Sequence, residues 1–573
     1  MPAVSRRLCA LLALPLAACV ALAQHPAEPV ADAQAPNTDS AAALPAQELT
    51  EELLYELLMG EVALQRGDAA LAAQTYVELA QRTRDPRIAR RAVEVANFAR
   101  MPQFALEAAR IWHQADAESM QALQTLTALL VSERKVDEAE PLLAKLLARD
   151  GAAAANGFLQ LGRLLAGNPD KQANLRVVRA LAARHPDVAQ ARVALAQAAL
   201  AAHDEAAALE EVRRAANMRP DWEVPAIYEA QILQRKSPEL AMQTLAGFLQ
   251  ANPKSREARI AYARLLVGER KFVEARAQFE QLLAAHPDNG DVRYAVGLLA
   301  LQLQDYATAE TALKRLLQMG FRDADGVRFT LGQAAEEQKK WDEAEQWYGS
   351  IQRGDRALSA RLRIAGVMAK QGRVGEAREY LRALDASGEQ RVQVLITEAQ
   401  ILRDARQHDV AFDLLGKALE AQPEQPELLY DHALTAEKLE RFDVLEASLR
   451  KLIRLRPDHA HAYNALGYSF AERNQRLPEA RKLIERALEL SPDDYYIIDS
   501  MGWVLYRMGD LKGAVEHLRR AYVGRPDAEI GAHLGEVLWR LGDRAEAERV
   551  WQEALKSHPE NETLHNTLKR LRP

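Results

Sequence analysis

The chain has 573 residues, a formal net charge of -7 at pH 7 and two cysteines. A mildly acidic chain argues against nucleic acid as the main ligand, because nucleic acid binding usually requires a pronounced basic face, and we expect no nucleic acid partner. Both cysteines, Cys9 and Cys19, lie near the N-terminus. This excludes a disulfide framework, thiolate metal sites and a cysteine nucleophile from the remainder of the chain.

Residues 1–18 have the pattern of an export signal. Arg6 and Arg7 precede an apolar stretch that ends at Ala18 and is too short to span a bilayer stably. The segment Leu16-Ala17-Ala18-Cys19 resembles a bacterial lipobox, in which Cys19 would be lipidated and become the first mature residue. The alternative is ordinary cleavage before Gln24, after Ala21-Leu22-Ala23.

We favour the lipobox. Val20, rather than aspartate, follows Cys19, which in Gram-negative lipoproteins implies an outer-membrane protein that faces the periplasm. Several acyl chains would hold such a protein on a membrane where one chain alone binds marginally. Ordinary cleavage would instead give a soluble periplasmic protein.

Residues 19–49 are rich in alanine, proline and glutamine and have no helical face to bury. They are predicted to form a flexible tether with a reach of roughly 30 Å. Thr50 is a suitable helix N-cap, and Glu51 and Glu52 follow in the first helical turn. We therefore expect the ordered part of the chain to begin at residue 50.

From there, alanine recurs every 33 to 35 residues along almost the whole chain. Asn174 and Leu445 fill two vacant positions in this series: Ala72, Ala105, Ala139, Ala208, Ala241, Ala275, Ala309, Ala344, Ala377, Ala411, Ala480, Ala514 and Ala547. A period near 34 residues is typical of a solenoid of stacked helical pairs, which presents a long concave wall rather than a catalytic pocket. The pattern favours binding over catalysis.

Two further residue types follow the same period. Small residues such as Gly467, Gly502 and Gly535 precede the alanine positions and would allow helices to cross closely. Prolines that would end the second helix of each pair come later: Pro186, Pro220, Pro253, Pro287, Pro423, Pro457, Pro492, Pro526 and Pro559. Aspartate follows six of these prolines and is a candidate cap for the next helix.

This pattern resembles the tetratricopeptide repeat (TPR) family, most closely from Met501 to Pro559. The resemblance implies an all-α, right-handed solenoid of about fifteen helical pairs at residues 50–559. Residues 560–573 are predicted to form a capping helix, because an open solenoid end needs a polar cover. No strand is expected.

Catalytic motifs are scarce. Ser132-Glu133-Arg134-Lys135 matches Ser-x-x-Lys, but the accompanying motifs of penicillin-interacting enzymes are missing. His459 and His461, near His432 by repeat position, could form a metal site, although exposed turn histidines are the simpler interpretation. We expect no catalytic residue, metal, cofactor or small-molecule substrate, while a hydrolase that uses Ser132 stays open as an alternative.

In such arrays the first helix of each pair lines the concave wall. Candidate partner-binding residues around its small central position are Asn464, Tyr468, Asp499, Trp503, Tyr506, Glu536 and Trp539. Alternatively, Trp503 and Trp539 fill space between stacked repeats. A short basic stretch is either a docking patch for an acidic partner or a set of solvated side chains: Arg82, Arg84, Arg87, Arg90 and Arg91.

The opening Tyr55–Ala63 and the closing Asp499–Tyr506 and His533–Trp539 also resemble the long TPR lipoproteins of proteobacteria. That resemblance implies a non-enzymatic adaptor that binds a periplasmic carboxyl-terminal processing protease and delivers peptidoglycan hydrolases to it. Protein partners and a lipid anchor are therefore expected. The alternative function is a scaffold for an envelope assembly or polysaccharide-export complex.

Overall fold

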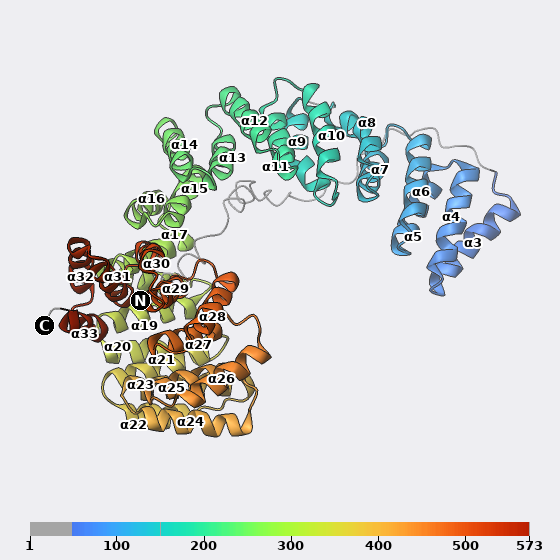
Figure 1. Cartoon of the computed structure of the whole chain (residues 1–573). Coiled ribbons are helices and arrows are strands. Elements are labelled where there is room, and N and C mark those ends of the chain that lie inside the picture. The colour runs from blue at the N-terminus through green and yellow to red at the C-terminus, as the bar shows by residue number, and fades with distance from the viewer. Residues whose placement is uncertain (1–47, 149–150, 572–573) are drawn as a thin grey trace. The chain divides into compact units, whose positions relative to one another are not determined.

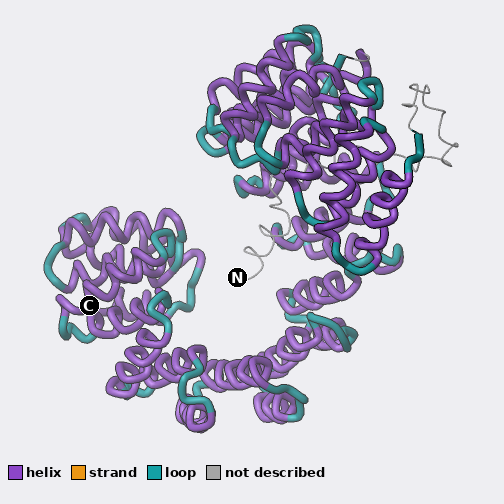
Figure 2. The backbone as a smooth tube through the Cα atoms, turned by 90° about the vertical axis from the view of Figure 1, so that its right-hand side faces the viewer, coloured by secondary structure: helices purple, strands orange, loops and turns teal. Residues whose placement is uncertain are grey.

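A computed structural model describes residues 48–148 and 151–571 of the chain, and this part contains helices without any strand (Figures 1 and 2). Helices α3 to α32 form fifteen consecutive pairs, and a single helix, α33, follows. The predicted all-α solenoid of about fifteen pairs with a C-terminal capping helix is thus confirmed. The predicted signal peptide, Cys19 and nearly all of the predicted tether lie outside the described residues.

The chain divides into two compact units, residues 1–319 and 320–573. The helices of unit 1 are α3 (Glu51–Gln65), α4 (Ala69–Thr83), α5 (Pro86–Phe98), α6 (Pro102–Ala115), α7 (Met120–Ser132), α8 (Val136–Leu147), α9 (Gly151–Leu165), α10 (Lys171–Ala183), α11 (Ala189–Ala201), α12 (Glu205–Met218), α13 (Glu223–Gln234), α14 (Pro238–Ala251), α15 (Arg256–Gly268), α16 (Phe272–Ala285), α17 (Gly290–Gln302) and α18 (Tyr306–Gln318).

The helices of unit 2 are α19 (Ala324–Glu337), α20 (Trp341–Gly349), α21 (Ala357–Lys370), α22 (Val374–Arg382), α23 (Gly388–Asp404), α24 (His408–Ala421), α25 (Pro426–Lys438), α26 (Phe442–Leu455), α27 (Ala460–Glu472), α28 (Leu477–Leu490), α29 (Tyr495–Arg507), α30 (Leu511–Gly524), α31 (Ala528–Leu541), α32 (Arg544–Ser557) and α33 (Glu562–Leu571). The even-numbered helix of each pair packs against its odd-numbered predecessor, except that α9 and α10 pack mainly against α11 rather than against each other.

The alanines of the 34-residue series lie where these helices cross, and each is completely buried. A larger side chain there would separate the helices. Asn174 is the polar exception, and its buried side chain is satisfied by hydrogen bonds. Its amide donates to Leu165 O at 2.9 Å, and its Oδ1 accepts from Asn168 at 2.8 Å. Leu445 is buried within the hydrophobic core of unit 2.

Helix boundaries follow local capping chemistry. Thr50 Oγ1 accepts a hydrogen bond from Leu53 N at 3.2 Å, so α3 begins where its N-cap predicts. The aspartates after the periodic prolines behave differently from our expectation, because only Asp527 caps the following helix. The other five lie in the preceding turn. After Pro492-Asp493, for example, the cap is Asp494.

The lengths of the helices vary most in the first part of unit 2. The periodic prolines are missing between Pro287 and Pro423, and the second helices α20 and α22 have only 9 residues each. The first helix α23 is correspondingly long, with 17 residues. Without a proline to set the helix end, the spacing of successive pairs varies here.

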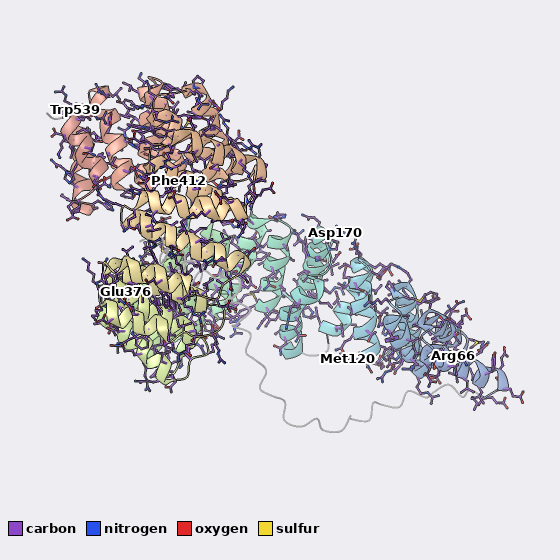
Figure 3. The ribbon with its side chains drawn as sticks, turned by 90° about the horizontal axis from the view of Figure 1, so that it is seen from below. Arg66, Met120, Asp170, Glu376, Phe412 and Trp539 are labelled. Atoms are coloured by element: carbon purple, nitrogen blue, oxygen red, sulfur yellow. The ribbon has the colours of Figure 1, made fainter. Side chains whose placement is uncertain are left out.

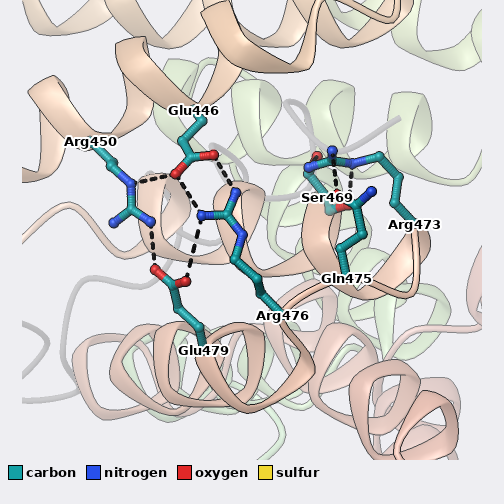
Figure 4. Close-up of polar contacts among 7 residues, drawn as sticks. All are labelled: Glu446, Arg450, Ser469, Arg473, Gln475, Arg476 and Glu479. Carbon is teal, nitrogen blue, oxygen red and sulfur yellow. Dashed lines mark hydrogen bonds and ion pairs between the residues drawn. The ribbon is translucent and has the colours of Figure 1, made fainter.

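Many ion pairs connect a residue with one about a repeat further along the chain. Figure 4 shows such a network, in which Glu446 pairs with Arg476 and Arg450, and Arg450 Nη2 lies 2.5 Å from Glu479 Oε1. Hydrogen bonds from Arg476 and Arg450 lower the pKa of Glu446 to about 2. Other examples are Arg91 with Glu61, Arg276 with Asp305, Arg373 with Glu345, and Arg403 with Asp431.

Candidate partner-binding surfaces

The predicted groove residues lie on the first helices α27, α29 and α31 of unit 2. Asp499, Trp503 and Glu536 have exposed fractions of only 6%, 4% and 1%. Their predicted position on an open wall is therefore corrected: they pack between repeats and leave almost no surface for a partner. For Trp503, filling of space between stacked repeats is the better interpretation.

Asp499 and Trp503 both contact His533, a residue that the sequence analysis did not select as a candidate. His533 Nδ1 lies 3.0 Å from both carboxylate oxygens of Asp499. The Trp503 ring stacks on the imidazole with centroids 4.1 Å apart, and Trp503 Nε1 donates to Glu472 Oε2 at 2.7 Å. Burial disfavours the imidazolium, but the charge of Asp499 and its hydrogen bond outweigh this, so the pKa of His533 is raised.

Glu536 connects the last complete pair to the capping helix. Its carboxylate accepts from Tyr506 OH at 3.0 Å and pairs with Arg570 of α33. A buried carboxylate requires such partners, because leaving its charge unpaired costs several kcal/mol. Glu536 therefore holds α29, α31 and α33 together rather than facing a groove.

The other predicted groove residues keep part of their surface. Asn464, Tyr468, Tyr506 and Trp539 are partly exposed. Trp539, labelled in Figure 3, contacts the Trp551 ring at 5.6 Å between centroids. Asn464 Oδ1 is buried without a hydrogen-bond partner among the described residues. These four side chains remain candidates for contact with a partner.

Carboxylates from four successive first helices act on Tyr468. They are Glu437 of α25, Glu472 of α27, Asp499 of α29 and Glu529 of α31. Desolvation and these charges raise the pKa of Tyr468, and desolvation also raises the pKa of Glu437 and Glu529. Sequence reasoning missed the three glutamates. The spacing of Glu472, one helical turn after Tyr468, is the signal that could have indicated one of them.

The predicted basic patch is largely neutralised within the chain. Arg84 Nη1 donates to Gln114 Oε1 at 3.0 Å. The other four guanidinium groups pair with carboxylates: Arg82 with Glu56, Arg87 with Asp85, Arg90 with Glu94, and Arg91 with Glu61. This favours the interpretation of solvated, locally paired side chains over a docking patch for an acidic partner.

The remaining candidates for catalysis or metal binding have structural roles in the helices. Ser132 ends α7, and its hydroxyl donates to Leu129 O at 2.8 Å. His459 caps α27 by accepting from Ala462 N at 3.1 Å. His432 is buried and stacks on Phe412 with centroids 4.4 Å apart. Across residues 48–148 and 151–571, no group of three or more potential ligands is arranged to hold a metal ion.

A cavity of about 730 Å³ opens between the first helices α21 and α23, in the irregular part of unit 2. Glu336 lies at its edge with an exposed fraction of 5%. Its carboxylate accepts from Arg363 at 2.6 Å, Lys370 at 2.8 Å and Tyr348 OH at 3.0 Å. One carboxylate thus faces two cations. Sequence reasoning did not select any of these residues.

The first helix of unit 1 carries an apolar stripe. Leu54, Tyr55, Leu58 and Val62 of α3 have exposed fractions between 44% and 67%. They lie on one side of the helix, because Leu54, Leu58 and Val62 are spaced four residues apart. Solenoid ends usually present a polar outer face. The last helix α33 follows this rule with exposed Glu562, His565 and Lys569.

Comparison with known sequences identifies the repeat. The sequence model of the tetratricopeptide repeat matches residues 260–326, 294–357, 430–495 and 533–566. A TPR repeat-containing protein of Pseudomonas aeruginosa is 34% identical over 494 residues, which cover 85% of this chain and 82% of that protein. The chain belongs to the tetratricopeptide repeat family. TPR proteins generally act as scaffolds for protein interactions.

Other similarities of this TPR protein are more distant. The human protein O-mannosyl-transferase TMTC1 is 26% identical over 213 residues, which cover 36% of this chain and 24% of the transferase. The crystal structure of yeast Tom70 has a TM-score of 0.37 and 14% identity, and it covers 74% of this chain and 96% of its own. None of the described helices of this TPR protein combines the length and apolarity of a transmembrane segment.

Proposed function

We propose that this TPR protein is a non-enzymatic adaptor on the periplasmic side of the outer membrane, anchored through lipid on Cys19. It brings a carboxyl-terminal processing protease together with peptidoglycan hydrolases that the protease degrades. Membership of the TPR family supports a scaffold role. The resemblance of the first and last repeats to long TPR lipoproteins supports the choice of partners.

The observation that carries the proposal is the presence of two unlike surfaces on two different units. Unit 1 offers the apolar stripe of α3, and unit 2 offers a polar, partly aromatic wall with a cavity. An adaptor needs two surfaces of different chemistry so that two partners bind at once. Holding both on one chain raises their effective concentration for each other without any new contact between them.

The local structure of the catalytic candidates supports a non-enzymatic role. The Ser132 hydroxyl donates to a backbone carbonyl at a helix end rather than to a general base that could activate it. If the chain is instead a hydrolase, Ser132→Ala would abolish an activity of the purified protein. We expect instead that the purified protein has no hydrolase activity.

Deletion of the gene, followed by quantitative proteomics of the envelope, tests the adaptor function. We expect a small set of peptidoglycan hydrolases to accumulate, as it would after loss of the protease itself. An unchanged hydrolase profile would contradict the proposal. Cross-linking in membranes and co-purification would then show whether secretion components are bound instead, as a polysaccharide-export scaffold requires.

Substitution in the α3 stripe tests whether partners use this surface. Leu58→Glu places a charge in the centre of the stripe and should strongly reduce recovery of one partner class in co-purification. Val523→Glu is the matched control, since Val523 is an exposed aliphatic residue of α30 in unit 2. Equal recovery with both variants would remove the stripe from the proposal.

A further inference from the structure

The cavity between α21 and α23 lies beside Gly366, at a repeat position that carries a side chain in other repeats. Four first helices of unit 2 have a small, buried residue at their crossing position. The residue that follows this position is Gly366 in α21, Gln400 in α23, Tyr468 in α27 and Trp503 in α29. The later repeats thus place large side chains at this position. In α21 the glycine leaves that space without a protein atom to fill it.

Gly366 differs from the glycines at the crossing positions of the first helices, such as Gly332 and Gly502. A Cβ atom built on Gly332 would lie 2.5 Å from Tyr348, and one on Gly502 would lie 2.5 Å from Leu518. At Gly366 no heavy atom lies within 4 Å of that position. Close helix packing therefore explains the first two glycines but not Gly366, whose missing side chain opens the cavity.

Part of the cavity wall around Gly366 is apolar. Leu362 and Ala369 of α21 face Ile396 and Ile401 of α23 across the space. A cavity of about 730 Å³ is large enough for the side chain of any amino acid together with part of its backbone. An apolar side chain entering this space would remove its surface from water, at about 25 cal/mol per Å².

Positive charge flanks the glycine on its own helix. Arg363 and Lys370 lie one turn before and one turn after Gly366, and both bind the same Glu336 carboxylate. Glu336 offsets only one of the two charges, and the cationic side chains remain about half exposed. On the opposite wall, Asp431 is paired with Arg403 at 2.5 Å, whereas Asp404 accepts from the neutral Gln400 amide at 2.7 Å and has no cationic partner among the described residues. An anionic group is therefore attracted to the α21 side.

We propose that this cavity binds a segment of a protein partner by accepting one bulky apolar side chain, while a neighbouring aspartate or glutamate pairs with Arg363 and Lys370. The partner supplies the side chain that Gly366 lacks, and the acidic residue completes the charge balance around Glu336. This inference rests on the proposed scaffold function and specifies the chemistry of one of its partners.

The test uses the full chain and three short fluorescein-labelled peptides that differ only in their central residues: Glu-Phe-Glu, Lys-Phe-Lys and Glu-Ala-Glu. Fluorescence polarisation measures their affinities. We expect the Glu-Phe-Glu peptide to bind at least about tenfold more tightly than either of the others, because only it provides both the apolar side chain and the anions. Equal binding of all three peptides, or no binding of the first at millimolar protein, would overturn the inference.

Gly366→Leu fills the cavity from the protein side and should weaken binding of the Glu-Phe-Glu peptide by at least about tenfold. Gly375→Leu is the matched control, because Gly375 is an exposed helical glycine of α22 with no heavy atom within 4 Å of its Cβ position. Circular dichroism of both variants checks that they fold. Unchanged affinity of Gly366→Leu would show that the peptide binds elsewhere.

Lys370→Gln tests the contribution of the positive charge separately from that of the cavity's shape. It should reduce the preference for Glu-Phe-Glu over Lys-Phe-Lys several-fold while both peptides still compete with each other, and an unchanged preference would contradict the role of Lys370. The proposed adaptor function is judged separately by the hydrolase profile after gene deletion. If hydrolases accumulate on deletion but not in a Gly366→Leu strain, the adaptor role stands and the cavity is not the client site.

Discussion

The glycines of the first helices illustrate how one residue type serves two purposes. Gly502 touches its neighbours so closely that a methyl group would meet Leu518 at 2.5 Å and the Ala514 carbonyl oxygen at 3.1 Å. Gly366 has open space in the same direction. The packing density of the surroundings, rather than the residue type, decides what a substitution at each glycine will do.

Gly502→Ala should therefore lower the free energy of unfolding by about 1–3 kcal/mol, because the added methyl group overpacks the α29–α30 crossing. Gly366→Ala is the control, and it should be neutral or stabilising, since alanine has the higher helix propensity. Urea denaturation followed by circular dichroism measures both. Similar effects of the two substitutions would contradict the close approach at Gly502.

Glu446 gives a second prediction for a single residue. Its pKa is about 2 in the folded chain, against an ordinary value of 4.5. A lowered pKa stabilises the fold above pH 4.5, and this contribution is lost as the pH falls from 4.5 towards 2. Glu446→Gln should cost about 1–2 kcal/mol at neutral pH and flatten the acid limb of the stability profile. An unchanged acid limb would contradict the assignment.

Single residues also mark the limit of sequence reasoning. The periodic alanines could be predicted as crossing points, because their spacing alone reveals them. The burial of Asp499, Trp503 and Glu536 could not, since it depends on His533 and Arg570, which lie a repeat further along the chain. The sequence indicates which helix such residues occupy, while their neighbours decide whether they reach the surface.

Among the helices, α29 and α31 are joined by an ion pair between Asp499 and His533 in a nearly water-free position. The pKa of His533 is raised in the folded chain. The pair therefore stabilises the fold fully below the ordinary histidine pKa of about 6.5, and the contribution declines as the pH rises through the raised value.

Asp499→Asn removes the charge that holds the proton on His533. It should lower the stability of the last repeats by about 1–3 kcal/mol at acidic pH and by less at alkaline pH, where the native pair has already weakened. Hydrogen exchange of α29 and α31 amides at several pH values measures this. A stability loss that grows with rising pH would contradict the predicted direction.

The sequence contains a signal that could have predicted the irregular helices α20 and α22. The periodic prolines stop at Pro287 and resume at Pro423, and between them the second helices are short. The missing prolines show that helix ends are not fixed there. They do not show that α21 and α23 separate enough to leave a cavity, because that depends on the side chains that fill the gap.

At the level of the whole molecule, a repeat array is stabilised by contacts between neighbouring repeats, so its parts can fold separately. The boundary between the units falls between α18 and α19, at a turn that contains Gly320 with a φ of +69°. A fragment of residues 320–573 keeps every described contact of unit 2, including the ion pair of Arg406 with Glu562 at 2.7 Å.

We expect this fragment to be helical by circular dichroism and to unfold cooperatively, while the full chain should unfold in more than one step. Differential scanning calorimetry of both proteins makes the comparison. A fragment ending instead after α26, at residue 455, cuts the core cluster of the last repeats and serves as the destabilised control. An unfolded 320–573 fragment would show that unit 2 depends on unit 1.

The period of the sequence could predict the number of helical pairs, because each pair repeats the same spacing. It could not predict the division into two units, since the 34-residue pattern continues through both. Gly320 and the turn around it resemble many other helix ends in the sequence. The division becomes visible only from the density of contacts on each side.

The ion pairs that reach forward by about one repeat have an evolutionary consequence. If recombination removes or duplicates a stretch of one period, the two junction repeats still carry an acid and a base at matching places, as Arg91 with Glu61 and Arg276 with Asp305 do. A slip by half a period would instead set like charges or unpaired groups opposite each other. The length of this chain can therefore change in whole modules while its stacking register is preserved.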